Sequence, residues 1–229
     1  MSDTQPEAAP SPAPYVVVVP VKPPAFGKSR LGGAGGGLPD EQRRELAEAF
    51  ALDTVEATLA TPGVAAVLVV TDDFRLATRM RALGCEMVPD GASEDLNATL
   101  VQGAAEVARR WPYAVPVALC ADLPGLRPAE LAEVLAEAGA HLAAGRAVFV
   151  RDRAGVGTTL YAAAAERFEP AFGVGSAARH QAGGCVEVGV TATSVRTDVD
   201  DPADLGAALL AGVGPHTSRA SGRRATPPG

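Results

Sequence analysis

Three features of this sequence predict an α/β fold of three layers, in which helices cover both faces of a mostly parallel central sheet. Short runs of Val, Leu and Ala recur along the chain, and turn residues bound each run. Longer segments with the apolar spacing of helices lie between these runs, so strand and helix patterns alternate. Four consecutive valines, residues 16–19, fit a strand that is covered on both faces, as strands of parallel sheets are.

The elements follow one another along the chain. The first strand begins at Tyr15, and further strands are expected at 65–70, 115–120, 147–150 and 195–199. Helices are expected at 40–60, 74–83, 94–110, 128–143 and 202–211. Asp40 fits the N-cap of the first helix, because a carboxylate accepts the free N–H groups of a first turn. The pair Asp201-Pro202 marks the start of the last helix, where a proline at the first position loses no hydrogen bond.

One folded domain is expected at 15–211. The chain has 229 residues, of which 47% are apolar and 4% aromatic, so a core of Val, Leu and Ala is predicted. Residues 1–14 are rich in Pro and Ala, and residues 212–229 are rich in Gly, Pro, Ser and Arg. Both ends are therefore predicted to be disordered tails, the second of them basic.

Charge and cysteine usage exclude several classes of protein. The net charge of −7 argues against general binding to nucleic acid or to an anionic membrane, which requires a basic surface. The three cysteines, Cys85, Cys120 and Cys185, lie far apart and form no C-x-x-C pair, so we interpret them as reduced thiols. No apolar run is long enough to span a bilayer, and the N-terminus lacks the pattern of a signal peptide. A cytoplasmic protein is expected.

The loop after the first strand carries three cations, Lys22, Lys28 and Arg30. In open α/β sheets ligands bind beyond the carboxyl ends of the strands, so these side chains are placed to bind a polyanion such as a triphosphate. The alternative is that they are solvated loop charges.

Two common phosphate-binding motifs fail in the same loop. Gly27-Lys28-Ser29 has the ending of a Walker A loop, but Lys22 stands where its first glycine belongs. The glycines between residues 32 and 37 do not have G-x-G-x-x-G spacing before a helix. Neither a P-loop nor a dinucleotide fingerprint is predicted.

Candidate metal ligands follow two strands. Asp122 stands at the end of the strand 115–120, and Asp198 and Asp200 lie at the end of the expected strand 195–199. Mg²⁺ needs only one or two protein carboxylates when substrate phosphates supply other ligands. At most one of Asp198 and Asp200 is expected to face the metal directly, while the other caps the helix at Pro202. The alternative for Asp122 is a turn-forming aspartate.

Two helix starts offer polar groups to a ligand. Gly173-Val174-Gly175 forms a turn that leads through Ser176 into a helix, and such a start favours an anion. An ordinary Ser N-cap is the alternative. Asp95 and Asn97, at the start of another helix, are placed to hydrogen-bond a guanine or ribose, or simply to stabilise that helix. No histidine stands in a nucleophile pattern, so no hydrolytic triad is predicted.

In this order, the segments VPVKPPAFGKSRL, ADLP, GTTL, FGVGS and DVDDPADL resemble the guanylyltransferase family that activates 2-phospholactate or phosphoenolpyruvate in coenzyme F420 biosynthesis. The likeness covers residues 15–211. It implies a Rossmann-like nucleotidyltransferase fold of the nucleotide-diphospho-sugar transferase type. It also implies GTP as the donor, Mg²⁺ as the cofactor, a small phosphorylated carboxylic acid as the acceptor and a downstream transferase as a possible partner.

The resemblance also implies roles for single residues. Thr158, Gly173 and Ser176 would bind a phosphoenolpyruvate-type acceptor. Asp122 and Asp198 would hold Mg²⁺, and Asp200 is a rival for the second position. The loop 22–30 would hold the triphosphate. Lys28 and Asp122 would be the catalytic residues. Asp95 and Asn97 would contact GTP.

Other readings stay open. The acceptor is phosphoenolpyruvate, 2-phospholactate or 3-phosphoglycerate, and the sequence allows a monomer or a homodimer. The nearest rival is a molybdopterin, cobinamide-phosphate or sugar-phosphate nucleotidyltransferase. These begin with a glycine-rich loop, whereas this chain has PVKPPAFGKSRLG, which favours a small acidic acceptor. A nucleotide-binding module without turnover is the alternative from another class.

Overall fold

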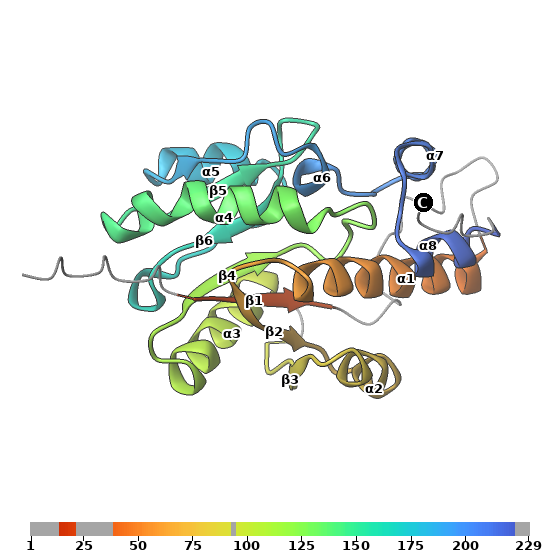
Figure 1. Ribbon diagram of the computed structural model, residues 1–229, viewed down its shortest axis with the longest axis horizontal. Helices are drawn as coiled ribbons and strands as arrows, with labels where there is room; N and C mark the ends of the chain where they lie inside the picture. Colours follow the sequence, from red (N-terminus) through yellow and green to blue (C-terminus); the bar gives the residue numbers. More distant parts are fainter. Residues whose placement is uncertain (1–13, 22–38, 93–94, 223–229) are drawn as a thin grey trace, which may run out of the picture.

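A single sheet of seven strands organises the computed structural model, which describes residues 14–21, 39–92 and 95–222 (Figure 1). The strands are β1 (Tyr15–Pro20), β2 (Val64–Val70), β3 (Glu86–Val88), β4 (Val115–Leu119), β5 (Val148–Arg151), β6 (Thr158–Ala162) and β7 (Val186–Glu187). Their order across the sheet is β3-β2-β1-β4-β6-β5-β7. Only β6 runs antiparallel to its neighbours, β4 and β5, among these strands. The predicted mostly parallel sheet is confirmed.

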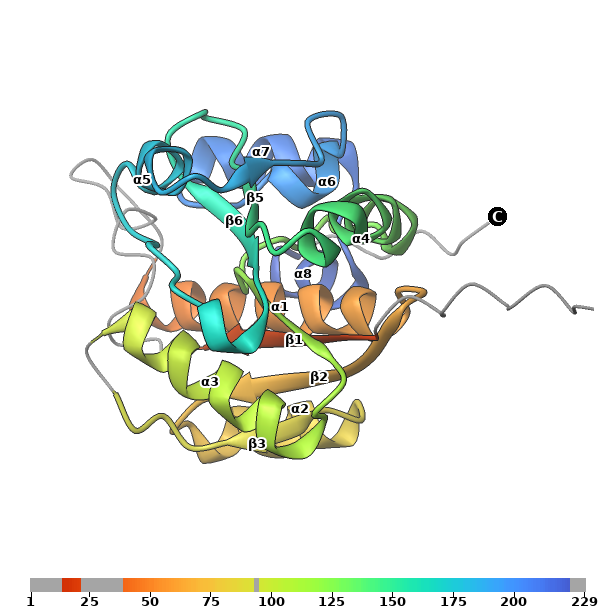
Figure 2. The same ribbon diagram turned by 90° about the vertical axis from the view of Figure 1, so that its left-hand side faces the viewer.

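Helices cover both faces of this sheet (Figure 2). They are α1 (Asp40–Leu59), α2 (Phe74–Ala82), α3 (Leu96–Arg110), α4 (Pro128–Ala143), a 3-10 turn η2 (Ala165–Arg167), α5 (Ser176–Ala182), α6 (Thr193–Arg196), α7 (Pro202–Ala211) and α8 (Pro215–Ala220). Successive side chains of β1 point to opposite faces of the sheet, as in any β-strand. Val17 and Val19 pack in a core with α1, α2 and α4, whereas Val16 and Val18 pack in a second core with α3 and α5.

All five predicted helices are present, with ends that differ by at most two residues. The predicted strand at 195–199 is wrong, because α6 occupies 193–196 and residues 197–200 have no regular structure. Strands β3, β6 and β7 were not predicted. β3 has three residues and β7 two, too few for an alternating pattern to show, and β6 begins directly after a glycine turn.

The structure also bears on membrane-spanning helices and on the state of the cysteines. Among the residues described here, no helix combines the length and apolar character needed to cross a bilayer. The three cysteines are free thiols, of which Cys85 is buried and the other two are half-buried.

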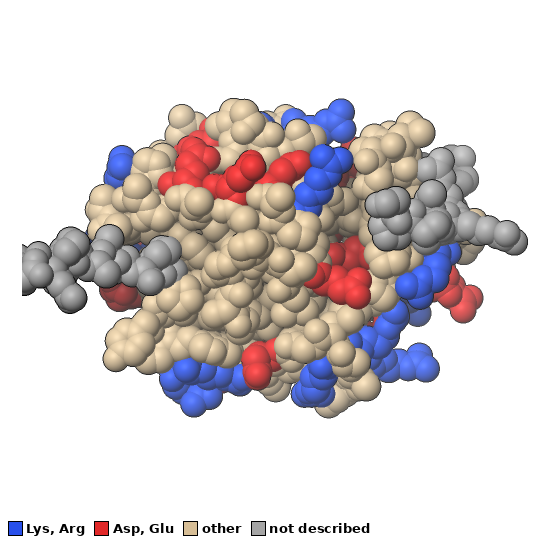
Figure 3. All heavy atoms as spheres, in the orientation of Figure 1, with Lys and Arg blue, Asp and Glu red and all other residues tan. Residues whose placement is uncertain are grey.

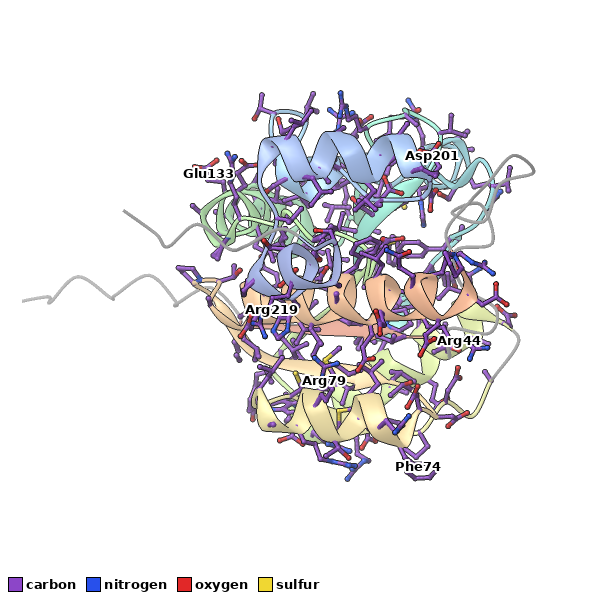
Figure 4. All side chains as sticks on the ribbon, turned by 90° about the vertical axis from the view of Figure 1, so that its right-hand side faces the viewer. Arg44, Phe74, Arg79, Glu133, Asp201 and Arg219 are labelled. Carbon is purple, nitrogen blue, oxygen red and sulfur yellow. The ribbon has the colours of Figure 1, made fainter. Side chains whose placement is uncertain are left out.

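The C-terminal segment departs from the prediction of a tail from residue 212 onwards. Helix α8 lies along α1, where Figure 4 labels Arg219. Asp53 of α1 is buried, and its two carboxylate oxygens accept the N–H groups of His216 at 2.9 Å and Thr217 at 2.8 Å. A Cβ atom on Gly214 would stand 2.3 Å from the same carboxylate, so only glycine fits there. A side chain from α1 therefore caps α8 across more than 160 residues of sequence.

Asp53→Asn is expected to destabilise the protein by about 2 kcal/mol, because an amide N–H group would replace one acceptor of a backbone N–H in a buried site. Urea unfolding, followed by circular dichroism, measures this change. The matched control is Glu56→Gln on the same helix, since Glu56 pairs with the His216 side chain at a more exposed position, where an ion pair contributes about 0–1 kcal/mol. Equal unfolding midpoints for Asp53→Asn and the wild type would contradict this role of Asp53.

Candidate active site

Three carboxylates meet beyond the carboxyl end of β4. Asp122 follows that strand, and Asp198 and Asp200 come from the irregular segment between α6 and α7. One oxygen atom from each of the three side chains lies within 4.8 Å of the other two. The N–H of Val199 donates to the carbonyl oxygen of Asp122 at 3.0 Å, which joins the two segments. We call Asp122, Asp198 and Asp200 the carboxylate cluster.

The prediction that only one of Asp198 and Asp200 reaches this position does not describe the structure. Residues two apart on a strand would already lie on one face, and residues 197–200 have no regular structure, so no alternation separates the two carboxylates. Neither residue caps α7. Asp201 does so, since its side chain accepts the N–H groups of Ala203 at 2.8 Å and Asp204 at 2.9 Å (Figure 4).

Thr54, which the sequence analysis missed, holds the loop that carries Asp122. This buried residue of α1 places its hydroxyl oxygen 3.2 Å from the carbonyl oxygen of Ala121 and 3.0 Å from the N–H of Leu123. The hydroxyl thus accepts the N–H of Leu123, while its single hydrogen is shared between the carbonyl oxygens of Phe50, at 2.8 Å, and Ala121. A threonine in a helical pattern carries no signal of such a contact, because its partners are 67 and 69 residues away.

Electrostatic repulsion is concentrated in the carboxylate cluster. Burial, followed by the negative charges of Asp122 and Asp200, raises the pKa of Asp198 to about 7. A divalent cation would relieve this repulsion, and carboxylate oxygens are the ligands that Mg²⁺ and Mn²⁺ prefer. The three residues therefore fit a divalent metal ion.

A pair of hydroxyls lies beside the strand that carries Asp122. Because β6 is antiparallel to β4, its first residue, Thr158, lies near the carboxyl end of β4, where the N–H of Cys120 donates to Thr159 at 2.9 Å. The hydroxyls of Thr158 and Ser176 are 3.0 Å apart, and both residues are buried. We call Thr158 and Ser176 the hydroxyl pair.

The turn before α5 brings Ser176 to this position. Gly173 has a φ of 118° and Gly175 a φ of 72°, values that favour glycine, and the carbonyl of Gly173 accepts the N–H of Ser176 at 3.0 Å. The alternative of an ordinary Ser N-cap is wrong. The N-cap is Gly175, and the Ser176 side chain contacts Thr158 instead of the helix start.

His180, on α5, lies behind the hydroxyl pair. Its Nδ1 atom is 3.0 Å from the Thr158 hydroxyl, and its Nε2 atom accepts the N–H of Ala171 at 2.9 Å. Burial, and then the positive charge of Arg179, lower the pKa of His180 to about 4. Since Nε2 accepts a proton donor, the neutral ring carries its hydrogen on Nδ1. Nδ1 therefore cannot take a proton from Thr158, and the contact is not a nucleophile–base pair.

Asp95 and Asn97, predicted to contact GTP, already bind backbone groups. Asp95 caps α3 by accepting the N–H of Asn97 at 2.9 Å and that of Ala98 at 3.2 Å. The Asn97 amide accepts the N–H of Phe172 at 2.8 Å and donates to its carbonyl at 3.2 Å. These contacts support structural roles, and contact with GTP stays a prediction.

The predicted triphosphate ligands cannot be placed. Lys22, Lys28 and Arg30 belong to the segment 22–38, which lies outside the described residues. On the face drawn in Figure 3, acidic side chains stand among the basic ones, and the described residues there form no continuous basic surface.

Comparison with known proteins identifies the family. The family model described as "Guanylyl transferase CofC like" matches residues 15–220. The chain belongs to the CofC-like guanylyl transferase family. Two relatives are named phosphoenolpyruvate guanylyltransferase. The protein from Streptomyces coelicolor is 49% identical over 91% of this chain and 96% of its own length, and that from Thermomonospora curvata is 47% identical over 91% and 89%.

Solved structures place this CofC-like protein among nucleotidyltransferase folds, as the resemblance implied. The crystal structure of 4-diphosphocytidyl-2C-methyl-D-erythritol synthase has a TM-score of 0.55 at 13% identity and covers 87% of this chain and 99% of its own. A Mycobacterium tuberculosis protein in complex with manganese has a TM-score of 0.51 at 19% identity and covers 87% and 100%. At these identities the similarity concerns the fold alone.

Asp198→Asn is expected to raise the melting temperature of the metal-free protein at pH 8 by about 2–4 °C, the effect of about 1 kcal/mol in a protein of this size. The raised pKa of Asp198 means that its ionised form costs folding stability. That cost grows as the pH rises from the unfolded pKa near 4 to the folded pKa near 7, so the gain should be smaller at pH 5 than at pH 8.

Differential scanning fluorimetry with and without MgCl₂ measures both effects. The wild type should be stabilised by Mg²⁺ and Asp198→Asn much less so. Glu133→Gln, an exposed change on α4, is the control and should keep the Mg²⁺ response (Figure 4). An Asp198→Asn protein that melts below the metal-free wild type and still responds fully to Mg²⁺ would argue against a metal site at the carboxylate cluster.

Proposed function

We propose that this protein transfers GMP from GTP to phosphoenolpyruvate, giving enolpyruvoyl-2-diphospho-5'-guanosine and pyrophosphate, as a step in coenzyme F420 biosynthesis. The family and the names of the relatives support the reaction class and this acceptor. The observation that carries the proposal is the position of the hydroxyl pair beside the strand that presents the carboxylate cluster. The carboxylates that would hold a metal ion and the hydroxyls that would bind an anion thus lie at one edge of the sheet.

The reaction itself needs no general base. A phosphate oxygen of the acceptor is already ionised, and it attacks the α-phosphorus of GTP while the bond from that phosphorus to the β-phosphate oxygen breaks. Pyrophosphate leaves with the electron pair of that bond. Thr158 and Ser176 need no base for this chemistry, because their hydroxyls would bind the acceptor and would not react.

The main obstacle is the repulsion between two polyanions. Two like unit charges 4 Å apart repel by roughly 4 kcal/mol at an effective dielectric constant of 20. A divalent ion, which we propose to be Mg²⁺, would be held by Asp122, Asp198 and Asp200 and would offset charge on the triphosphate. Thr54 would keep Asp122 in place for this role.

The acceptor would be oriented by the hydroxyl pair and by the turn at Gly173. Hydroxyl and backbone N–H donors bind phosphate and carboxylate oxygens without adding a charge that must be desolvated. The triphosphate would be bound by Lys22, Lys28 and Arg30, as the sequence predicts. The guanosine would be contacted by Asp95 and Asn97. A cytoplasmic location and direct transfer of the product to a downstream transferase belong to the same proposal.

The acceptor is tested by pyrophosphate release with GTP and Mg²⁺ in four parallel reactions, containing phosphoenolpyruvate, 2-phospholactate, 3-phosphoglycerate or no acceptor. Release should be fastest with phosphoenolpyruvate. Each reaction is repeated with the downstream transferase and its deazaflavin substrate, so that an unstable product does not mask turnover. Fastest release with another acid would change the acceptor within the same reaction. No release in any reaction would refute the proposal.

Asp122→Asn is expected to lower kcat with phosphoenolpyruvate at least about 100-fold, the scale of losing one electrostatic contact to a transition state. The amide keeps the size of the side chain, so the melting temperature without Mg²⁺ should not fall. Glu133→Gln again serves as the control and should keep wild-type kcat. Full Mg²⁺-dependent turnover by Asp122→Asn would exclude this residue from the catalytic role.

A further inference from the structure

We propose that His180 is a positioning residue that makes the hydroxyl pair a net hydrogen-bond donor toward an anionic acceptor. The inference rests on the proposed function, since it concerns how the same site holds phosphoenolpyruvate. His180 would touch neither substrate. It would act through Thr158, whose hydroxyl lies 3.0 Å from its Nδ1 atom.

The tautomer of His180 follows from its backbone contact. A main-chain N–H can only donate, so the contact of 2.9 Å from Ala171 makes Nε2 an acceptor without a hydrogen. The neutral ring must then carry its hydrogen on Nδ1. The lowered pKa, about 4, keeps the ring neutral near pH 7. Nδ1 therefore carries the hydrogen, which lies toward the Thr158 hydroxyl and the Ser176 backbone, and Nδ1 cannot accept a hydrogen bond from Thr158.

The number of hydroxyl hydrogens sets the direction of the hydrogen bonds that link His180, Thr158 and Ser176. Thr158 and Ser176 have two hydroxyl hydrogens between them, and their mutual hydrogen bond of 3.0 Å uses one. Because Nδ1 cannot accept a hydrogen bond from Thr158, the second hydroxyl hydrogen is left to donate outside this three-residue chain. With the hydrogen on Nε2 instead, Ser176 would donate to Thr158 and Thr158 to His180. No hydroxyl hydrogen would then remain for a ligand.

Aromatic rings surround His180 and hold the plane of its ring. Phe149 and Tyr161 stack with it at centroid distances of 5.6 Å and 5.0 Å, and Phe172 meets it edge-on at 5.7 Å. A rotated ring would lose the contact with Ala171, which precedes the turn at Gly173. One side chain thus couples the direction of the hydroxyl pair to the position of that turn.

The chemical consequence is selectivity for an acceptor that only accepts hydrogen bonds. The phosphate and carboxylate oxygens of phosphoenolpyruvate are such acceptors, and a hydrogen bond to an ionised group contributes more than one to a neutral group. A hydroxyl pair that turned its lone pairs toward these oxygens would repel them. The ring therefore sets acceptor affinity without contact with the acceptor.

The test separates the two nitrogen atoms of the ring. His180→Gln can place an acceptor near the Nε2 position for Ala171 but no donor at the Nδ1 position, whereas His180→Asn can place an amide donor near Nδ1. His180→Gln should raise the KM for phosphoenolpyruvate about 10- to 100-fold, the effect of one hydrogen bond to a charged group. His180→Asn should restore part of this loss. The KM for GTP and kcat should change by less than about threefold, about 0.65 kcal/mol.

Thr158→Val tests whether His180 acts on acceptor binding through the Thr158 hydroxyl. If His180 acts through the Thr158 hydroxyl, His180→Gln should not raise the KM for phosphoenolpyruvate further in a Thr158→Val background. A merely structural His180 would give additive losses, and it would raise the KM for GTP as well. Additive losses would overturn the inference.

A spectroscopic measurement covers the case in which these variants fold poorly. Nitrogen-15 NMR of the wild-type protein should show a hydrogen on Nδ1 and none on Nε2 of His180 between pH 6 and pH 8. The chain has three histidines, so the signal lost in any folded His180 variant identifies the ring. The opposite tautomer, or a ring protonated in this range, would overturn the inference. A wild type without pyrophosphate release would count against the proposed function alone, since the tautomer is measured without turnover.

Discussion

The direction of β6 is the constraint on which the site depends. In a fully parallel sheet the first residue of a strand lies at the edge away from the ligand, and Thr158 would be remote from Asp122. Because β6 runs antiparallel to β4, its beginning lies at the carboxyl end of β4 instead. The same reversal lets the chain leave β6 and return through the turn at Gly173 to α5, which carries Ser176 and His180.

Around this edge, polar side chains mostly hold the backbone in place. Thr54 accepts the N–H of Leu123, next to Asp122, and Asn97 binds both backbone groups of Phe172. Arg179 reaches the carbonyl groups of Ala171, Phe172 and Val174. Each of these residues ties a loop to a helix, and rigid support of this kind is what precise placement of two substrates requires.

The carboxylate cluster has the opposite character, since it stores repulsion. Three negative groups share one small region, and the burial of Asp198 raises the cost of its charge. Burying a charged carboxylate beside two others costs folding stability. This repulsion suits a site for a cation, because a divalent ion would offset the negative charge of the three side chains.

Strands β1, β2, β4 and β5 and the longer helices were readable from the sequence because they depend on short-range patterns. The valines of β1, the apolar spacing of α1 to α4 and the Asp201-Pro202 start of α7 each describe a local preference. Asp122 could be singled out for the same reason, since it directly follows a clear strand. The family was also readable, because its motifs occur in a fixed order along the chain.

Contacts between distant segments were decided only by the tertiary structure. The segment 197–200 has no regular structure, and the hydrogen bond from the N–H of Val199 to the Asp122 carbonyl joins it to the end of β4 beside Asp122. Helix α8 forms in a segment of tail-like composition because Asp53 supplies its cap. Thr54 and His180 lie on ordinary helical positions, and their partners come from other elements. A hydrogen bond depends on distance in space, and local sequence patterns record only neighbours along the chain.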